Sequence, residues 1–490
     1  MPRGRERYDV VVVGAGPNGL AAAIALAQRG LATLLVEASD SPGGGARSAE
    51  LTVPGFLHDV CSSVHPLGVA SPFFRSLGLE RHGLEWIESP APLAHVFRDG
   101  RAITMERSLE ATGAGLGRDG PAYVRLLRPF VEHFDELLPM VLGPPGLPPD
   151  PVLYARFGLR ALPSLSTLAS RWFRGEDAPA LLAGIAAHAM RPLEAAATSS
   201  FALVLAMAGH AVGWPLAKGG SQAITSALVA RFRALGGELA LHFRVSRLDE
   251  LPTARAYVFD VTPKQLVEIA GAAFPSHYRK ALQRYAYGPG VFKMDFALSE
   301  PIPFRDPACA RAATVHLSGT LEDVALAERT VVEGRMAPHP FVLLVQPTRF
   351  DPSRAPEGKH IAWAYCHVPH GSPVDASGAI EAVIEEVAPG FRDTILARHA
   401  MDPLALERYD ENYVGGDIGG GRVDVRQLLF RPVMRPDPYA TPAPNVFLCS
   451  SSTPPGGGVH GMCGYHAAQS VLRNVFERDA REGARAAFRA

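Results

Sequence analysis

The chain has 490 residues and a formal net charge of −1, which argues against nucleic acid as the main partner because nucleic-acid-binding proteins usually carry a basic field. Its length suggests two or three domains. The five cysteines are odd in number and widely spaced, which indicates reduced thiols in a cytoplasmic protein rather than a disulfide framework. Nearly all of the positive charge is arginine, which is typical of a GC-rich bacterial genome.

The first predicted element is a buried strand over Val10–Val13, a β-branched apolar run. Gly14, Gly16 and Gly19 follow with the spacing G-x-G-x-x-G. The first allows a tight turn, the second a close approach of backbone N–H groups to a diphosphate, and the third close packing of the next helix. That helix is predicted over Leu20–Arg29, and the positive end of its dipole faces the diphosphate.

A second strand is predicted over Leu31–Val36, and Glu37 follows it directly. A carboxylate at this position can accept hydrogen bonds from both hydroxyls of an adenosine ribose and would repel a 2′-phosphate, which favours FAD or NAD over NADP. The glycine spacing alone is a weak signal because glycine-rich turns occur in many folds. The whole unit of strand, glycines, helix, strand and acid is much stronger.

A second glycine-rich segment, Gly43–Arg47, comes soon after the acid. With this segment the sequence resembles the FAD-binding oxidoreductases that include amine oxidases and phytoene desaturases. The resemblance implies that the second glycines let the backbone pass the FAD diphosphate and that Arg47 lies near its charge. A plain nucleotide-binding turn followed by a flexible glycine-rich loop would explain the same residues without this second contact.

The segment after the second glycine motif contains His58, Asp59 and His65, the first titratable candidates for a pocket. In the resembled family this segment folds back towards the flavin; the alternative is that all three are surface or loop residues. The stretch 71–215 is predicted to be mostly helical, with helices over Asp177–Met190 and Ala195–Gly209 that are apolar nearly all round. We interpret this stretch as a cap that supplies apolar pocket walls.

The loop Trp214–Ser221 resembles the point at which phytoene-desaturase relatives return to the FAD domain, although a loop capped by Ser221 would explain it without a ligand. Strands are predicted over Leu239–Val245 and Ala256–Asp260, with a shorter hairpin between them than in larger relatives. The residues expected in the substrate pocket are His58, His210, Trp214 and Lys218.

A strand that alternates in polarity after Val291 is predicted to be half-buried. Lys293 on this strand loosely matches a lysine that, in amine oxidases, holds a water against flavin N5. It is therefore the first candidate for a catalytic side chain, and the alternative is a lysine on the exposed face of an edge strand. Further strands over Phe341–Gln346 and His360–His367 are expected to form an antiparallel sheet at the floor of the pocket.

The C-terminal region is predicted to contain a strand over Asn445–Cys449, a glycine-rich turn and a helix from Ala467 to about Ala480. This unit again builds an anion-favouring helix N-terminus. In the resembled family the turn lies under the flavin ring and ribityl chain. Relatives commonly carry an acidic residue where this chain has Ser450-Ser451, so hydroxyl groups would replace a carboxylate contact to FAD.

The candidate catalytic residues are Lys293, His460 and His65; His460 could donate to the substrate or to a flavin carbonyl. No metal site is predicted, because the spacing His460-x-x-Cys463-x-x-His466 lacks a fourth ligand nearby. The residues that the resemblance places on FAD come from both ends of the chain and from its middle. They are Gly14, Gly16, Pro17, Asn18, Gly19, Glu37, Ala38, Gly44, Gly45, Ala46, Arg47, Val245, Ser451, Gly458, Val459, His460, Gly461 and Met462.

The predicted fold class is mixed α/β and α+β. A discontinuous Rossmann-like FAD-binding domain is expected over 1–70, 215–270 and 440–490, and a substrate-binding domain of helices and an antiparallel sheet, with a helical cap, over 71–214 and 271–439.

The resemblance implies an FAD-dependent oxidoreductase of the desaturase, dehydrogenase or oxidase type. An apolar or amphipathic small molecule would give hydride to flavin N5, and dioxygen or a quinone would reoxidise the flavin. Two alternatives stay open: a monooxygenase or reductase fed by NAD(P)H, and a non-catalytic flavin-binding scaffold.

The expected localisation is cytoplasmic. The most apolar later stretch, Phe201–Ala217, is interrupted by His210 and Trp214-Pro215 and falls short of a membrane span, so a buried helix beside a pocket is predicted. Peripheral membrane contact stays open, because an enzyme with a lipid substrate could expose such a surface. The choice between a monomer and a homodimer also stays open.

Overall fold

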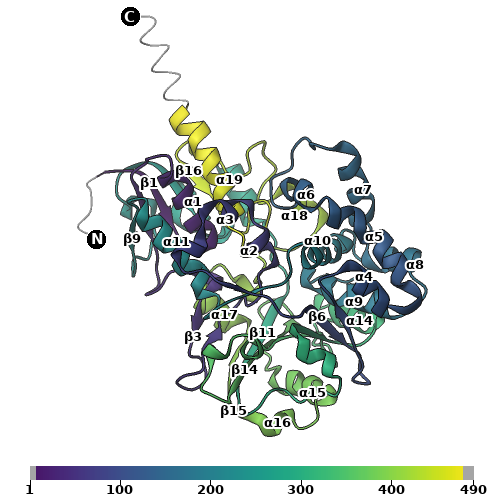
Figure 1. The fold of residues 1–490 in the computed structure, drawn as a ribbon. Helices are drawn as coiled ribbons and strands as arrows, with labels where there is room; N and C mark the ends of the chain where they lie inside the picture. Colours follow the sequence, from purple (N-terminus) through teal and green to yellow (C-terminus); the bar gives the residue numbers. More distant parts are fainter. Residues whose placement is uncertain (1–6, 478–490) are drawn as a thin grey trace, which may run out of the picture.

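The protein is described by a computed structural model that covers residues 7–477. Two sheets organise these residues (Figure 1). A parallel sheet at the upper left lies beside both ends of the described chain, and a larger mixed sheet lies below it. A group of helices on the right stands beside both sheets. The mixed helix and sheet content confirms the predicted fold class.

The parallel sheet has five strands in the order β16-β10-β1-β2-β9. Its strand β1 lies in the centre, and burial on both faces explains its continuous apolar sequence. The strands come from distant parts of the chain, as the discontinuous domain predicts. They are β1 (Tyr8–Val13), β2 (Thr33–Val36), β9 (Glu238–Ala240), β10 (Ala254–Phe259) and β16 (Val446–Leu448).

Three helices pack together beside the parallel sheet: α1 (Pro17–Ala27), α11 (Gln222–Ala234) and α19 (Met462–Val471). The helices α1 and α19 approach so closely that a Cβ atom on Gly464 would collide with the carbonyl oxygen of Asn18. Only a glycine at this position permits the contact. This contact brings the two ends of the chain together.

The second sheet has seven strands in the order β15-β11-β14-β13-β12-β6-β7, all antiparallel except for the pair β12 and β6. They are β6 (Ala91–Val96), β7 (Ala102–Met105), β11 (Gly290–Leu298), β12 (Ala312–Leu317), β13 (Val342–Val345), β14 (His360–Val368) and β15 (Ile395–Met401).

One prediction about this sheet was wrong. The strand β11 is not half-buried: it lies between β15 and β14 and all of its residues are buried. Its polar side chains Lys293 and Asp295 pair with each other, which lets polar residues occupy a buried face. The stretch 71–215 is mostly helical, as predicted, but it also contributes β6 and β7, because the apolar run of β6 pairs inside this sheet.

The helices of the cap surround α10, which contacts α5, α7 and α9 and is apolar nearly all round for that reason. They are α4 (Leu109–Gly115), α5 (Gly120–Glu132), α6 (Phe134–Val141), α7 (Pro151–Ala161), α8 (Leu165–Trp172), α9 (Asp177–Ala186) and α10 (Thr198–Ala211). The other helices are α2 (Pro66–Ala70), α3 (Pro72–Leu77), α12 (Pro263–Ala270), α13 (Ser276–Gln283), α14 (Leu321–Val332), α15 (Ser377–Val387), α16 (Phe391–Thr394), α17 (Pro403–Tyr409) and α18 (Val425–Phe430).

Two predicted boundaries differ from the structure by more than the others. The strand expected over Leu239–Val245 ends at Ala240, so Val245 lies outside it. The helix α19 begins at Met462 rather than Ala467, and the predicted end at Ala480 lies outside the described residues. Within residues 7–477 no helix combines the length and the apolar character needed to cross a membrane.

We retain the two-domain division as a proposal. Its support is that the strands of the parallel sheet fall within 1–70, 215–270 and 440–490, whereas those of the seven-stranded sheet fall within 71–214 and 271–439.

Candidate cofactor and substrate site

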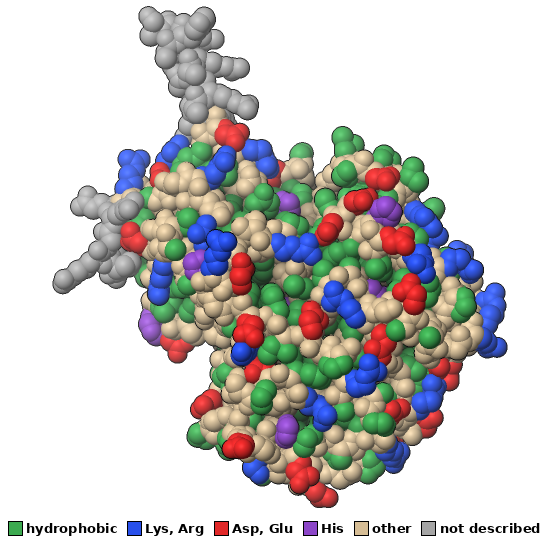
Figure 2. Space-filling model, in the orientation of Figure 1, with side chains coloured by type: hydrophobic (Ala, Val, Ile, Leu, Met, Phe, Trp, Pro, Cys, Tyr) green, Lys and Arg blue, Asp and Glu red, His purple; other side chains and the backbone are tan. Residues whose placement is uncertain are grey.

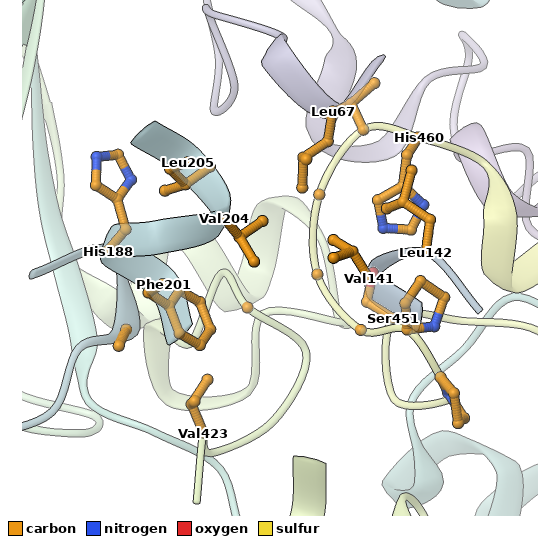
Figure 3. A pocket seen from close by; sticks show the side chains of 18 of the residues that line it. Leu67, Val141, Leu142, His188, Phe201, Val204, Leu205, Val423, Ser451 and His460 are labelled. Atoms are coloured by element: carbon orange, nitrogen blue, oxygen red, sulfur yellow. The ribbon is translucent and has the colours of Figure 1, made fainter. Parts of the chain in front are cut away.

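A cavity of about 1040 Å³ extends from the glycine-rich turns to the helical cap. We call its two ends the glycine end (Gly16, Gly44, Ser451, Gly457 and His460) and the cap end (His188, Phe201, Val204, Leu205 and Trp214). Figure 3 shows His460 and Ser451 on one side of this space and His188, Phe201, Val204 and Leu205 on the other.

The glycine end is formed by turns that follow three strands of the parallel sheet. Gly16 caps α1 after β1, and no side chain provides a hydrogen bond at this cap. A Cβ atom on Gly44 would stand 3.3 Å from the Cα atom of Gly16, so the two glycine motifs touch. A Cβ atom on Gly45 would collide with the Tyr413 hydroxyl. The two motifs therefore form a narrow backbone cradle at the positive end of α1.

The turn after β16 completes this end. Ser451 lies on the lining, and its hydroxyl is 3.4 Å from Nδ2 of Asn18, a residue 433 positions away in the chain. The Oδ1 atom of Asn18 is buried and has no partner within residues 7–477. A glycine cradle, a helix N-terminus and an unpaired amide oxygen fit the diphosphate and sugar of a dinucleotide.

Glu37 and Arg47 interact with each other rather than lining the cavity. The Glu37 carboxylate accepts hydrogen bonds from the backbone N–H groups of Ala15 (2.8 Å) and Ser39 (3.0 Å). The Arg47 guanidinium lies 3.3 Å from Glu37 and also donates to the carbonyl oxygen of Ser41. Arg47 thus contacts Glu37 and not the cradle. The Glu37 carboxylate can still accept further hydrogen bonds, for example from ribose hydroxyls.

Asp260 is a cavity-lining residue that the sequence analysis missed as a site residue. It follows β10, and its Oδ2 atom accepts a hydrogen bond from the N–H of Gly19 in the first turn of α1 (2.8 Å). Burial, together with the charges of Asp410 and Glu37, raises the pKa of Asp260 to about 8 against the effect of that hydrogen bond. An acidic side chain with a raised pKa thus lies beside the cradle.

We expect Asp260→Asn to change how stability depends on pH. Since the pKa of Asp260 is raised on folding, the folded state retains this proton longer, and the wild-type protein loses stability as pH rises from about 4 to about 8. The contribution of one such proton is at most about 1.4 kcal/mol per pH unit. Denaturant unfolding of the FAD-free protein at pH 6 and pH 9 should show the variant gaining stability over wild type at the higher pH. If the stabilities of the wild-type protein and the variant changed with pH in the same way, the raised pKa of Asp260 would be refuted.

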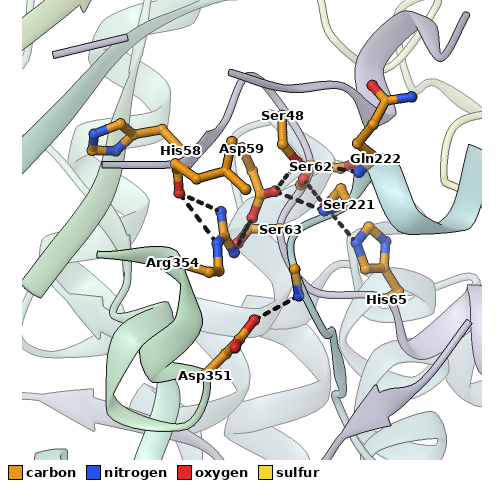
Figure 4. Close-up of polar contacts among 12 residues, drawn as sticks. Ser48, His58, Asp59, Ser62, Ser63, His65, Ser221, Gln222, Asp351 and Arg354 are labelled. Atoms are coloured by element: carbon orange, nitrogen blue, oxygen red, sulfur yellow. Dashed lines mark hydrogen bonds and ion pairs between the residues drawn. The ribbon is translucent and has the colours of Figure 1, made fainter. Parts of the chain in front are cut away.

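His65 lies on the cavity wall and is held by a chain of hydrogen bonds (Figure 4). The Ser221 hydroxyl donates to the carbonyl oxygen of Ser62 (2.6 Å), so it accepts from Nε2 of His65 (2.8 Å). The Nδ1 atom then carries a lone pair, and it has no partner in the described part of the chain. Burial lowers the pKa of His65 to about 4, so the ring is neutral.

His460 also lies on the lining and is neutral. The N–H of Met462 donates to Nδ1 of His460 (3.0 Å), so the ring proton is on Nε2. Burial lowers the pKa of His460 to about 4, opposed by the carbonyl groups of Gly457 and Gly456. The ring can therefore act as a hydrogen-bond donor through Nε2, and it is not a cation.

Lys293 and His58 lie behind the cavity wall. The Lys293 ammonium pairs with Asp295 and is 5.9 Å from the ring centre of Trp363, which does line the cavity. The Nδ1 atom of His58 is 3.7 Å from Asp295, and its Nε2 atom is 2.8 Å from the Thr52 hydroxyl. His58 is thus not a pocket residue. The catalytic role of Lys293 stays a prediction that requires access past Trp363.

The structure also corrects the placement of His210 and Lys218. His210 is hydrogen-bonded to the Tyr123 hydroxyl (2.9 Å) inside the cap, where burial makes this partner necessary. Lys218 is exposed and pairs with Glu85 (2.9 Å). Of the four predicted pocket residues, only Trp214 lines the cavity.

The predicted FAD contacts divide into two groups. Those on the cavity lining are Gly16, Pro17, Asn18, Gly44, Gly45, Ala46, Ser451, Gly458, Val459 and His460. Those outside the lining are Gly14, Gly19, Glu37, Ala38, Arg47, Val245, Gly461 and Met462. Gly14 and Gly19 pack against each other and against Asp260 and so shape the turn from behind. The sequence analysis missed His188, although an isolated histidine in a predicted apolar helix was a usable signal.

Comparisons with known proteins agree with this geometry. A family model described as FAD dependent oxidoreductase matches residues 9–273. Pyridine nucleotide-disulfide oxidoreductase domain-containing protein 2 of Rattus norvegicus is 25% identical over 96% of this chain and 94% of its own length. A lycopene-forming phytoene desaturase of Paracoccus is 24% identical over 93% of this chain and 95% of its own length.

The solved structure of cyclohexylamine oxidase from Brevibacterium oxydans is similar in fold, with a TM-score of 0.59 and 17% identity over 96% of this chain and 99% of that one. The sequence similarity to the desaturase confirms the predicted resemblance, and the similarity to the amine oxidase structure is one of fold. Because the family model covers more than half of the sequence, the chain belongs to the FAD dependent oxidoreductase family.

Proposed function

We propose that the protein removes hydride from an apolar or amphipathic small molecule that occupies the cavity between the glycine end and the cap end. The observation that carries this proposal is the continuous apolar wall between the two ends. It includes Leu67, Leu142, Phe201, Val204 and Leu205. When bound, FAD supplies hydride acceptance at N5. The wall of the cavity orients the substrate and excludes water from it.

The charges on the lining favour an uncharged substrate over an amine. Within residues 7–477 the carboxyl groups on the lining are Asp260, Asp410 and Asp417. All three accept backbone hydrogen bonds, and burial raises the pKa of each. Each carboxyl group on the lining already has backbone donors, and Arg422 and Arg431 also line the cavity, so a substrate ammonium group would gain little compensation for its lost hydration.

The two neutral histidines differ in what they offer to the cavity. The unpaired Nδ1 atom of His65 is enclosed by protein atoms, so its lone pair does not reach the cavity, whereas Nε2 of His460 carries the ring proton. Because the His460 ring is uncharged, it can act as a donor without placing a charge in the cavity. We propose dioxygen or a quinone as the acceptor that reoxidises the flavin.

Anaerobic flavin bleaching tests this function. We expect a panel of long-chain unsaturated hydrocarbons and alcohols to bleach the bound flavin, and diamines of similar length to fail. Bleaching by NADPH but by no apolar compound would favour the reductase or monooxygenase alternative instead. The variant Val204→Asp places a charge in the apolar wall and should weaken bleaching at a fixed substrate concentration with unchanged FAD content. Its matched control is Val332→Asp on the exposed face of α14.

We further propose that the cap contacts a lipid surface. Exposed apolar side chains gather on α7, on the loop before it and at the residue that follows it: Leu147 (99% exposed), Val152 (78%), Leu159 (76%) and Leu162 (59%). Leu147 and Leu162 also line the cavity. Hydrophobic side chains are visible along the upper right edge of Figure 2, where Figure 1 places α6 and α7. An apolar rim of this kind would let a water-insoluble substrate enter without crossing water.

Vesicle co-sedimentation checks this contact. We expect the wild-type protein to sediment with phosphatidylcholine vesicles and the double variant Leu147→Asp/Val152→Asp to remain in the supernatant. Leu326→Asp is the control, because Leu326 is about as exposed as Leu162 but lies on α14. Equal sedimentation of the double variant and the control would end the proposal.

A further inference from the structure

Three histidines from different elements meet at the cap end of the cavity. His188 follows α9, His316 lies on β12, and His95 lies opposite His316 on the neighbouring strand β6. The Nε2 atoms of His188 and His316 are 3.3 Å apart, and Nε2 of His95 is 2.6 Å from the carbonyl oxygen of Gly319. Only His188 reaches the cavity lining.

The hydrogen-bond partners determine where the protons are. A carbonyl oxygen can only accept, so Nε2 of His95 carries its proton. The Nδ1 atom of His316 is buried without a partner in the described chain, because it faces Gly184, where a Cβ atom would come within 2.7 Å of it. A proton there would be an unpaired buried N–H, which is rarer in proteins than an unpaired acceptor. We therefore place the proton of His316 on Nε2, where it donates to Nε2 of His188.

The proton of His188 must then be on Nδ1. This atom has no hydrogen-bond partner within residues 7–477. His188 is half-buried and lines the cavity, whereas His95 and His316 are completely buried. Burial lowers the pKa of His188 to about 3, so the ring is neutral. The cap end thus presents a neutral N–H donor in an apolar environment.

The surroundings hold this donor in place. The ring of His188 meets Trp214 edge to face, with 5.8 Å between the ring centres. Met190, two residues further on and also on the lining, has a φ of 51°, in the left-handed region that non-glycine residues seldom adopt. Such backbone strain persists where packing imposes it and is frequent at ligand sites.

We propose that Nδ1 of His188 donates a hydrogen bond to an uncharged oxygen acceptor, a carbonyl or hydroxyl group, at the end of the substrate remote from the glycine end. This inference rests on the proposed function and specifies its substrate class: an amphipathic molecule with one neutral oxygen group on an apolar body. A pure hydrocarbon would leave the donor unpaired when it displaced water from the cap end.

Ligand binding to the FAD-loaded protein tests the inference. A long-chain ketone and the alkene of equal length are titrated while the fluorescence of Trp214 and the other tryptophans is followed. We expect the ketone to bind about ten-fold more tightly than the alkene, the value of one hydrogen bond to a buried neutral donor. His188→Phe should abolish this preference without weakening alkene binding. The control His133→Phe changes a half-exposed histidine outside the cavity and should retain the preference.

Infrared spectroscopy provides a second measurement on the wild-type protein. The stretching band of a ¹³C-labelled ketone carbonyl should move to lower wavenumber on binding, because a hydrogen bond weakens the C=O bond. An unshifted band, or a ketone preference that survives in His188→Phe, would overturn the inference. If the preference depends on His188 but no apolar ligand bleaches the flavin, the proposed function fails while the donor site stands.

Discussion

Gly16→Val is expected to yield folded protein that has lost most of its FAD. Gly16 lies on the cavity lining at the N-terminus of α1, and a Cβ atom there would stand 2.9 Å from Oδ2 of Asp260. A valine would displace Asp260 and project its methyl groups into the space that a diphosphate needs next to the helix N-terminus. We expect FAD to bind about 100-fold more weakly, which corresponds to about 2.7 kcal/mol.

The measurement is the ratio of visible to ultraviolet absorbance of the purified protein, followed by titration with FAD. Gly378→Val is the matched control, because Gly378 lies in α15, outside the cavity lining, and a Cβ atom there would meet no heavy atom within 4 Å. Far-ultraviolet circular dichroism establishes that both variants fold. A Gly16→Val protein that retains full FAD with wild-type affinity would show that the diphosphate does not approach this turn.

The second large effect is expected for Arg354→Met, in a buried ion pair. The guanidinium of Arg354 is 2.9 Å from Asp59, and both side chains are 1% exposed. The same arginine donates to the carbonyl oxygen of Leu57, while Asp59 also accepts from Ser48, Ser63 and the N–H of Ser221 (Figure 4). This cluster joins the turn before α11 to the loop between β13 and β14.

Methionine preserves much of the volume of arginine but leaves the Asp59 carboxylate buried without its cation. Removing one partner of a buried pair typically costs about 3–5 kcal/mol, because the remaining charge is uncompensated. Urea unfolding should therefore show a large loss of stability, and the loss of orientation at Ser221 should also disturb His65, which Ser221 holds.

Arg311→Met is the control for this variant. Arg311 contacts both carboxylate oxygens of Glu106 at 2.8 Å, but its side chain is 50% exposed. A solvent-exposed pair of this kind contributes about 0–1 kcal/mol. Equal destabilisation by the two substitutions would mean that burial does not determine how much the ion pair between Arg354 and Asp59 contributes to the free energy of unfolding.

The sequence by itself determined the family, the cofactor and the predicted β-α-β unit around Gly14, Gly16 and Gly19. These features are local: a continuous apolar strand, a fixed glycine spacing and an acid at the end of the next strand can all be recognised within about 30 residues. The later glycine-rich turn at Gly456–Gly458 could also be recognised, because the sequence around it repeats the same pattern of strand, turn and helix.

Only the tertiary structure decided which polar residues reach the cavity. His58, His65, His210 and Lys218 were all candidates in the sequence, yet of these four only His65 lines the cavity. His58 and His210 meet buried partners away from the lining, and Lys218 is exposed beside Glu85. Asp260 lies at the site because of the register of β10 beside β1. His188 is oriented by His316 on β12, which lies 128 residues later in the chain. Such long-range pairings depend on packing between segments, and no local pattern encodes them.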